Sequence, residues 1–259
     1  MTDSRVRPFA GRDGLDLAYR ETGEGRPLVL LHGFAATARQ WLDHGPAAVL
    51  AAQGNRVILP DLRGHGDSAR PHDPARYPPD VLADDGLALI DRLGLDDYDL
   101  GGYSLGARIM LRMLVRGARP ARAIVAGQGL AAVSSAANGG TNRRVLTALA
   151  NGDSIDPGSP DAEAAHWITH LGGDPRALLQ VLNSLIATPG LALRQIQTPA
   201  LIVAGDQDHA HASAEALAVV LPNARFTRVP GDHWSAFTRP ELATAITAFL
   251  AGRSREPKP

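Results

Sequence analysis

Cysteine is absent from the 259 residues of this chain, and lysine is almost absent. Without cysteine there is no disulfide, no thiolate nucleophile and no Cys-ligated zinc, and the redox compartment stays open. Of the 26 basic residues only Lys258 is a lysine, and the arginines are scattered along the whole sequence. They nearly balance the 27 acidic residues, so we expect neither a nucleic-acid-binding face nor an acidic tail.

Long hydrophobic runs are also missing. The cleanest apolar stretches, such as 28–31, have the length of a strand and fall far short of the roughly 20 residues of a membrane span. The first twelve residues contain Asp3, Arg5, Arg7 and Arg12 with no apolar stretch behind them, unlike a secretory signal. We therefore expect a soluble, cytoplasmic protein without a membrane partner.

Short apolar runs alternate with amphipathic helical segments through most of the chain. This alternation is typical of an α/β protein, in which helices cover both faces of a mostly parallel sheet. The runs that predict strands are 28–31, 56–59, 99–102, 123–126, 201–204 and 226–229.

One predicted helix covers residues 105–115, which are apolar nearly all round. The exceptions are Arg108, Arg112 and Arg116, four residues apart on one face. We interpret them as the single solvated stripe of a buried helix, in preference to a phosphate-binding ladder.

A second predicted helix, 242–250, carries an apolar stripe toward the end of the chain. Thr238 and Glu241 stand before it at the spacing of a capping box. Beyond Gly252 the tail 253–259 has nothing to pack against, and we expect it to be disordered.

Residues 127–198 interrupt the alternation, because no strand-like run occurs in them. Asp174-Pro175 predicts the N-cap and first turn of a helix within this segment. We interpret the segment as a helical cap inserted over the sheet, with 1–126 and 199–252 as the two parts of the core.

The pentapeptide Gly102-Tyr103-Ser104-Leu105-Gly106 follows a predicted strand and opens a predicted helix. A serine on such a sharp turn needs neighbours without a Cβ, and in a chain of this composition the pattern is expected by chance roughly 0.1 times. A serine hydroxyl is a weak nucleophile that needs a base, and the base needs an orienting carboxylate.

Carboxylates and an imidazole follow the last two predicted strands. Asp206 and Asp208 come after the fifth strand, and His233 comes after the sixth. Because the carboxyl ends of parallel strands meet at one edge of a sheet, these groups can converge with Ser104.

With these motifs in this order, the chain resembles the α/β-hydrolase superfamily, in particular its serine esterase and perhydrolase-like branch. Two further segments carry the resemblance. Residues 31–34 (Leu-His-Gly-Phe) look like the family's oxyanion loop, and residues 61–68 look like its D-x-R-G-x-G-x-S signature. The resemblance covers nearly the whole chain and implies the α/β-hydrolase fold with a helical cap.

By this resemblance Ser104 is the nucleophile, His233 is the general base and then the acid, and Asp208 orients the histidine. The backbone N–H groups of Phe34 and Leu105 are then expected to form the oxyanion hole, since such donors need no particular side chain. Serine at position 104 argues against haloalkane dehalogenases and epoxide hydrolases, which resemble this pattern but carry an aspartate nucleophile.

The acid position has two rivals in the sequence, Asp206 and, less plausibly, Asp232, which is adjacent to the histidine that it would have to face. In some relatives the acid follows an earlier strand, but here that loop, 127–129, has no carboxylate. We expect Asp61 and His65 to support the loop under the oxyanion hole.

Six further residues are candidates for the substrate pocket: His32, Tyr103, His166, Trp167, His170 and Trp234. His166 and His170 stand at i, i+4, and His209 and His211 are near the catalytic edge, but a zinc site needs three or four ligands, and no H-E-x-x-H motif is present. No phosphate loop or dinucleotide fingerprint occurs either, so we expect no metal and no cofactor.

These features favour a serine hydrolase that cleaves a small carboxylic ester through an acyl-enzyme intermediate. Perhydrolases or non-haem haloperoxidases, in which hydrogen peroxide replaces water, share the triad, as do lactonases, thioesterases and carbon–carbon bond hydrolases. A hydrolase-fold receptor that binds a small ligand with little turnover is an alternative of another class. The substrate depends on how the cap packs, and neither it nor the oligomeric state follows from the sequence.

Overall fold

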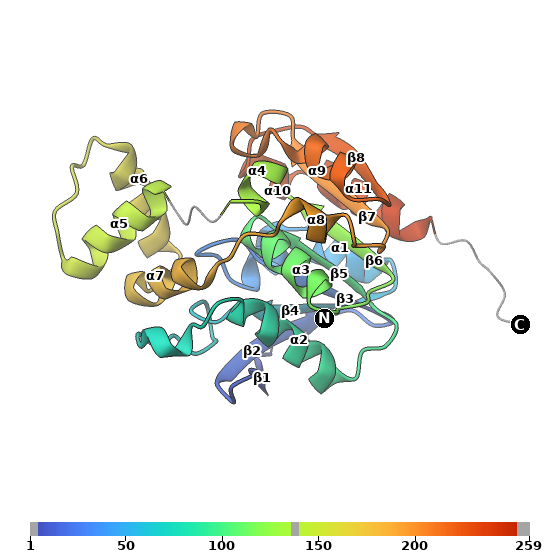
Figure 1. Ribbon diagram of the computed structural model, residues 1–259, viewed down its shortest axis with the longest axis horizontal. Helices are drawn as coiled ribbons and strands as arrows, with labels where there is room; N and C mark the ends of the chain where they lie inside the picture. The colour runs from blue at the N-terminus through green and yellow to red at the C-terminus, as the bar shows by residue number, and fades with distance from the viewer. Residues whose placement is uncertain (1–4, 136–139, 253–259) are drawn as a thin grey trace, which may run out of the picture.

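The computed structural model describes residues 5–135 and 140–252 of the chain. In this part an eight-stranded sheet runs in the order β1-β2-β4-β3-β5-β6-β7-β8 (Figure 1). All pairs from β4 to β8 are parallel, whereas β1–β2 and β2–β4 are antiparallel. The strands are β1 (Arg7–Ala10), β2 (Asp16–Thr22), β3 (Arg26–Leu31), β4 (Asn55–Asp61), β5 (Asp99–Tyr103), β6 (Arg122–Ala126), β7 (Ala200–Gly205) and β8 (Ala224–Val229).

Helices and short helical turns connect the strands. They are η1 (Gln40–His44), α1 (Ala47–Ala52), η2 (Pro74–Arg76), α2 (Val81–Leu93), α3 (Leu105–Val115), α4 (Leu130–Val133), α5 (Gly140–Asn151), α6 (Pro160–His170), α7 (Pro175–Ser184), α8 (Gly190–Leu193), η3 (His209–His211), α9 (Ala214–Val220), α10 (Ser235–Thr238) and α11 (Pro240–Ala251). Within the described ranges, none of these helices has the length and apolar character needed to cross a membrane.

Two layers of helices cover the sheet, one on each face. Successive side chains of a strand point to opposite faces, so a central strand buried on both sides reads as one continuous apolar run. In β3, Leu28 and Leu30 belong to the core formed with α1, α10 and α11. Val29 and Leu31 belong to the core formed with α2, α3 and α9. The predicted α/β fold class is therefore confirmed.

Each of the six predicted strands lies within an observed strand, β3 to β8. The predicted helix 105–115 coincides with α3. The apolar pattern did not predict β1 and β2, because these antiparallel strands at the sheet edge contain several charged and polar residues and no long apolar run.

The predicted capping box before the last helix is wrong. Thr238 ends the short helix α10, and its hydroxyl donates a hydrogen bond to the carbonyl of Ser235 (3.1 Å). Helix α11 instead begins at Pro240, with Arg239 as an N-cap that makes no side-chain capping bond. Glu241 is therefore at the second helical position, too early to complete the box with Thr238.

The predicted solvated stripe on α3 is wrong for two of its three arginines, since only Arg116 is exposed. Arg108 is only 7% exposed, and the side chain of Arg112 is 11% exposed. Helix α2 packs on this side of α3 and, with its N-cap, supplies Asp80 and Asp84, which pair with Arg112 and Arg116. At Arg112 a largely buried ion pair thus replaces the solvent that the helical period alone suggested.

Helices α4 to α8 stand between β6 and β7, and Figure 1 shows α5, α6 and α7 (yellow to ochre) as a lobe to one side of the sheet. The predicted helix start at Asp174 is confirmed, because its carboxylate accepts bonds from the backbone N–H groups of Arg176 (3.0 Å) and Ala177 (3.1 Å). The limits 127–198 of the cap remain predictions, and the predicted disordered tail 253–259 lies outside the described residues.

Candidate active site

Ser104 occupies a strained turn between β5 and α3, with φ 54° and ψ −116°. Positive φ is costly for a residue with a Cβ, and such strain is concentrated at functional sites. Gly102 and Gly106 make the turn possible. A Cβ on Gly102 would overlap the backbone of Gly106, and a Cβ on Gly106 would overlap the backbone of Leu31. The turn holds the serine at the edge where the parallel strands end.

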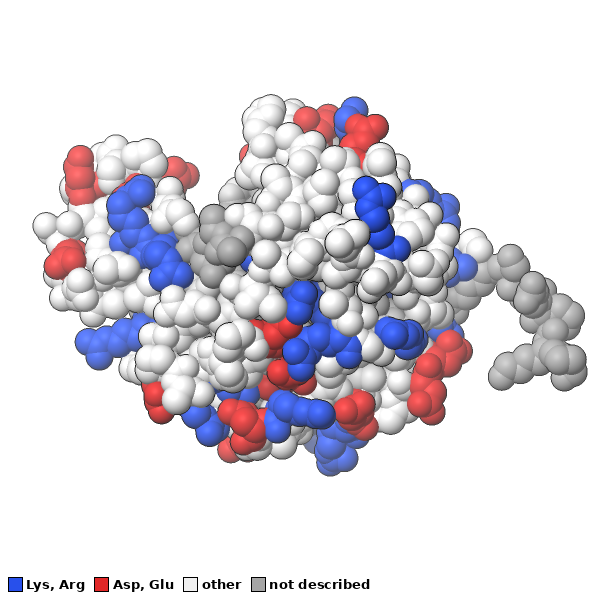
Figure 2. Space-filling model, viewed as in Figure 1, with Lys and Arg blue, Asp and Glu red and all other residues white. Residues whose placement is uncertain are grey.

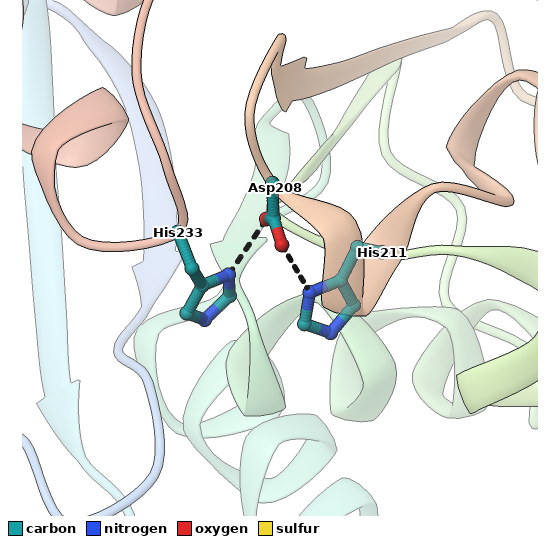
Figure 3. A group of neighbouring side chains, drawn as sticks. All are labelled: Asp208, His211 and His233. Atoms are coloured by element: carbon teal, nitrogen blue, oxygen red, sulfur yellow. Dashed lines mark hydrogen bonds and ion pairs between the residues drawn. The ribbon is translucent and has the colours of Figure 1, made fainter.

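The three residues predicted to converge do so. His233 Nε2 lies 3.0 Å from Ser104 Oγ, and His233 Nδ1 lies 2.8 Å from Asp208 Oδ2 (Figure 3 shows the carboxylate and its two imidazoles). The serine follows β5, the aspartate follows β7 and the histidine follows β8. This is a triad-like arrangement assembled from three loops at one sheet edge.

The rival carboxylates are occupied elsewhere. Asp206 Oδ1 accepts a hydrogen bond from the N–H of Gly231 (2.9 Å) and so anchors the loop that carries the histidine. Asp232 Oδ1 accepts bonds from the N–H groups of Trp234 (3.0 Å) and Ser235 (2.8 Å) at the start of α10. Both side chains organise the histidine loop.

A second imidazole shares the acid, and the sequence did not assign it this role. His211 Nδ1 lies 3.1 Å from Asp208 Oδ1, and its ring stacks on that of His233 with centroids 4.6 Å apart (Figure 3). Burial raises the pKa of Asp208, but the hydrogen bonds from His211 and His233 outweigh it and hold the pKa below its usual range. The only sequence signal was the spacing of three residues between Asp208 and His211, about one helical turn.

The same three side chains could also hold a metal ion. One potential ligand atom each of Asp208, His211 and His233 lies within 4.8 Å of the others, the one such group in the part of the chain that the structure describes. Two histidines and a carboxylate are a donor set that zinc accepts. Without a metal ion, a proton on Nδ1 of each histidine accounts for the same contacts with Asp208. His233 Nε2 can then accept a hydrogen bond from Ser104 Oγ, as a triad requires.

The two predicted oxyanion-hole donors belong to different elements of the fold. Phe34, after β3, and Leu105, the first residue of α3, both line the cavity described below. Among the described residues neither N–H has an acceptor. The neighbouring Gly33 N–H is occupied by Gln40 Oε1 (3.0 Å), a positioning contact that the sequence did not predict.

Asp61 holds the loop beneath these donors. Its Oδ1 accepts from the N–H of Ala38 (2.6 Å), and its Oδ2 accepts from the N–H of Asp67 (3.1 Å). Burial raises the pKa of Asp61, and these two bonds oppose that shift. The side chain acts as a brace between two loops, as we interpreted from the sequence.

His32 does not line the cavity, so its prediction as a pocket residue is corrected. The ring is fully buried under the oxyanion loop, where Nε2 accepts from the N–H of Leu62 (3.0 Å). Nδ1 therefore carries the proton and donates to the carbonyl of Gly33 (2.8 Å). Burial lowers the pKa of His32 to about 4. Burial and the nearby ring of His32 together lower the pKa of His65 to about 3.

A cavity of about 910 Å³ opens beside Ser104. The other five predicted pocket residues line it: Tyr103, His166, Trp167, His170 and Trp234. Trp167 on α6 contacts Trp234 beside the histidine, with ring centroids 4.5 Å apart, so the lobe and the sheet edge both form its walls. Figure 2 shows a notch between the lobe and the rest of the molecule, with acidic and basic side chains interspersed on the visible face.

A family model described as "Alpha/beta hydrolase family" matches residues 28–245, and the chain belongs to this family. The dihydrolipoyllysine-residue acetyltransferase component of the acetoin cleaving system of Pseudomonas putida is 32% identical over 235 residues, 77% of this chain. The match spans only 58% of that relative's length. A non-heme haloperoxidase of Rhodococcus erythropolis is 29% identical over 257 residues, 86% of this chain and 91% of that protein.

A solved structure agrees with this membership. An esterase from Rhodococcus sp. ECU1013 superposes with a TM-score of 0.74 at 26% identity, covering 98% of this chain and 100% of the other. The α/β-hydrolase fold with a triad-like Ser104, His233 and Asp208 is thus established.

The two buried histidines predict acid sensitivity. Well above pH 6.5, the ordinary pKa of histidine, both are neutral in the folded and the unfolded chain. As the pH falls from 6.5 toward about 4, the unfolded chain binds protons that folded His32 and His65 reject, so the free energy of unfolding decreases. Each histidine contributes about 3 kcal/mol to this loss. Thermal unfolding from pH 7 to pH 4 measures it.

His65→Asn should flatten this pH dependence, because the variant lacks one of the two imidazoles that bind a proton in the unfolded chain but not in the folded chain. His209→Asn is the matched control, since His209 is exposed. Parallel stability curves for wild type and His65→Asn would contradict the assignment.

Proposed function

We propose that the chain is a serine hydrolase that cleaves small carboxylic esters through an acyl-enzyme intermediate. One observation carries the proposal: Ser104 Oγ, His233 and Asp208 form a hydrogen-bonded line of 3.0 and 2.8 Å at the wall of a cavity. A nucleophile next to its base, with the base oriented by a third group, is the signature of covalent acyl transfer.

In the first half of the reaction, Ser104 Oγ forms a bond to the ester carbonyl carbon while its proton moves to His233 Nε2. The imidazolium formed faces Asp208, whose lowered pKa keeps it ionised. The carbonyl oxygen takes up the negative charge and accepts hydrogen bonds from the free N–H groups of Phe34 and Leu105.

The second half returns the enzyme to its starting state. His233 donates its proton to the alcohol oxygen as the C–O bond breaks, and the acyl group remains on Ser104. A water molecule then attacks the acyl carbon while His233 takes its proton. Collapse of this intermediate releases the carboxylic acid and returns the proton to Ser104 Oγ.

A perhydrolase is the second candidate, favoured by the similarity to a non-heme haloperoxidase over most of both chains. Hydrogen peroxide would then take the place of water at the acyl-enzyme and release a peracid. An activity panel of p-nitrophenyl esters, lactones and thioesters, run with and without peroxide, separates these chemistries. Ligand-induced stabilisation with poor turnover throughout the panel would favour a receptor.

Ser104→Ala should remove ester hydrolysis, with a loss on the order of 10⁴ to 10⁶ in kcat. The melting temperature should stay close to that of the wild type, because Ala takes the same turn but has no nucleophile. A fluorophosphonate probe should label the wild type only. If the variant is still labelled, Ser104 is not the nucleophile.

Asp208→Asn should lower kcat by about 10⁴, because the amide stabilises the wrong tautomer of His233 and does not balance its positive charge. Asp206→Asn is the matched control, since the amide oxygen can still accept from the N–H of Gly231. Turnover and melting temperature of both variants decide the assignment. An inactive Asp206→Asn beside an active Asp208→Asn would reverse it.

Dialysis against EDTA should leave ester hydrolysis unchanged, because the proposed mechanism uses protons on the two imidazoles that share Asp208. Added Zn²⁺ should inhibit, since a metal ion on His233 and Asp208 displaces those protons. His211→Asn, which removes one of the three donors, should weaken this inhibition. Loss of activity on dialysis with recovery on adding Zn²⁺ would contradict the metal-free mechanism.

A further inference from the structure

The three arginines on one side of α3 differ in their partners. Arg112 and Arg116 form ion pairs with Asp80 and Asp84. Arg108 is the most buried of the three, at 7% exposure, and among the described residues no carboxylate pairs with its guanidinium. Burial of a cation without a counter-ion is strongly unfavourable, so this arginine requires an explanation.

The hydrogen bonds of Arg108 leave part of the guanidinium without a partner. Nη2 donates to the carbonyls of Ser135 (2.9 Å) and Ile186 (3.0 Å), which flank the segment containing α5 to α7. Nε is buried without an acceptor, and Nη1 bonds to no residue in the described part of the chain. Neutral carbonyls satisfy donors but do not neutralise the charge. Burial, and then the charge of Arg112, lower the pKa of Arg108, as expected for a cation that lacks a counter-ion.

Arg108 lines the same cavity as Ser104. The two residues are one helical turn apart, and the N–H of Arg108 donates to the carbonyl of Ser104 (3.1 Å). Among the described residues that line the cavity, the one carboxylate is Glu163, which is on the exposed face of α6 and forms no ion pair with Arg108.

We propose that Arg108 binds a carboxylate carried by the substrate, so that this site prefers esters whose acyl chain ends in a free carboxylate. The substrate carboxylate is then the counter-ion that no described residue provides to Arg108. It binds one helical turn from the nucleophile. A short dicarboxylic acid esterified at one end has this form, with the ester at Ser104 and the carboxylate at Arg108. Arginine suits this task, because its charge persists even when buried.

The test compares monomethyl glutarate, which carries a free carboxylate, with dimethyl glutarate, its neutral counterpart with the same acyl chain. Acid release is followed in a pH-stat. Wild-type protein should have the higher kcat/KM for the monoester. In Arg108→Gln the ratio of monoester to diester kcat/KM should fall about 10- to 100-fold, the usual contribution of a hydrogen bond to a charged group, mainly through KM of the monoester. Arg108→Lys, which keeps the charge, should retain part of the preference.

Arg112→Gln is the matched control. It removes a charge one turn further along α3, from a residue that pairs with Asp80 and does not line the cavity beside Ser104. Its ester preference should equal that of the wild type. Equal losses on both esters in Arg108→Gln would make Arg108 a structural link between Ser135 and Ile186 and overturn the proposal. A wild-type preference for the diester would also overturn it, even if Arg108→Gln does not fold.

The inference rests on the proposed hydrolase function, and a binding measurement separates the two. In the Ser104→Ala protein, glutarate should raise the melting temperature, glutaramide should not, and the added change Arg108→Gln should abolish the shift. A glutarate shift that depends on Arg108, without hydrolysis of either ester by the wild type, would contradict the hydrolase function alone. Hydrolysis without a glutarate shift or an ester preference would contradict the Arg108 site alone.

Discussion

The close approach of α3 to β3 is the constraint on which the rest of the site depends. It requires glycine at position 106, where any side chain would overlap the backbone of Leu31. With α3 seated this closely, Ser104 is held at positive φ, and Leu105 and Arg108 line the same cavity. A helix set further out would separate the hydroxyl from the histidine that follows β8.

Charge compensation differs sharply between Asp208 and Arg108. At the sheet edge, Asp208 is buried but has two imidazole donors, so its negative charge is stabilised in place. Along α3, the guanidinium of Arg108 is also buried, and its bonds within the described residues go to neutral carbonyls. A buried charge with partners is compatible with a stable, preorganised site, whereas one without a counter-ion is a cost that a bound anion can offset.

The lobe formed by α5, α6 and α7 completes the cavity. The lobe contacts the loop that carries the proposed catalytic histidine, because Trp167 packs on Trp234, the residue that follows His233. The bonds of Arg108 to Ser135 and Ile186 tie the chain to α3 on both sides of this lobe. Substrate choice in such an arrangement depends on how the lobe is seated, whereas the proposed bond-breaking chemistry depends on the sheet edge alone.

The sequence by itself determined strands β3 to β8, helix α3 and the convergence of Ser104, Asp208 and His233. Continuous apolar runs mark strands buried on both faces, and glycine spacing marks the sharp turn, so both signals are local. The tertiary structure alone decided which faces are covered. Helical period suggested solvent beside Arg108 and Arg112, but α2 packs beside Arg112, and the chain at Ser135 and Ile186 bonds to Arg108. His32 was expected in the pocket but is under the loop, where it accepts from the N–H of Leu62, and the ring of His211 stacks on His233 only because the loops after β7 and β8 meet. Contacts between segments distant in sequence leave no periodic trace, so burial and pairing of this kind require the folded chain.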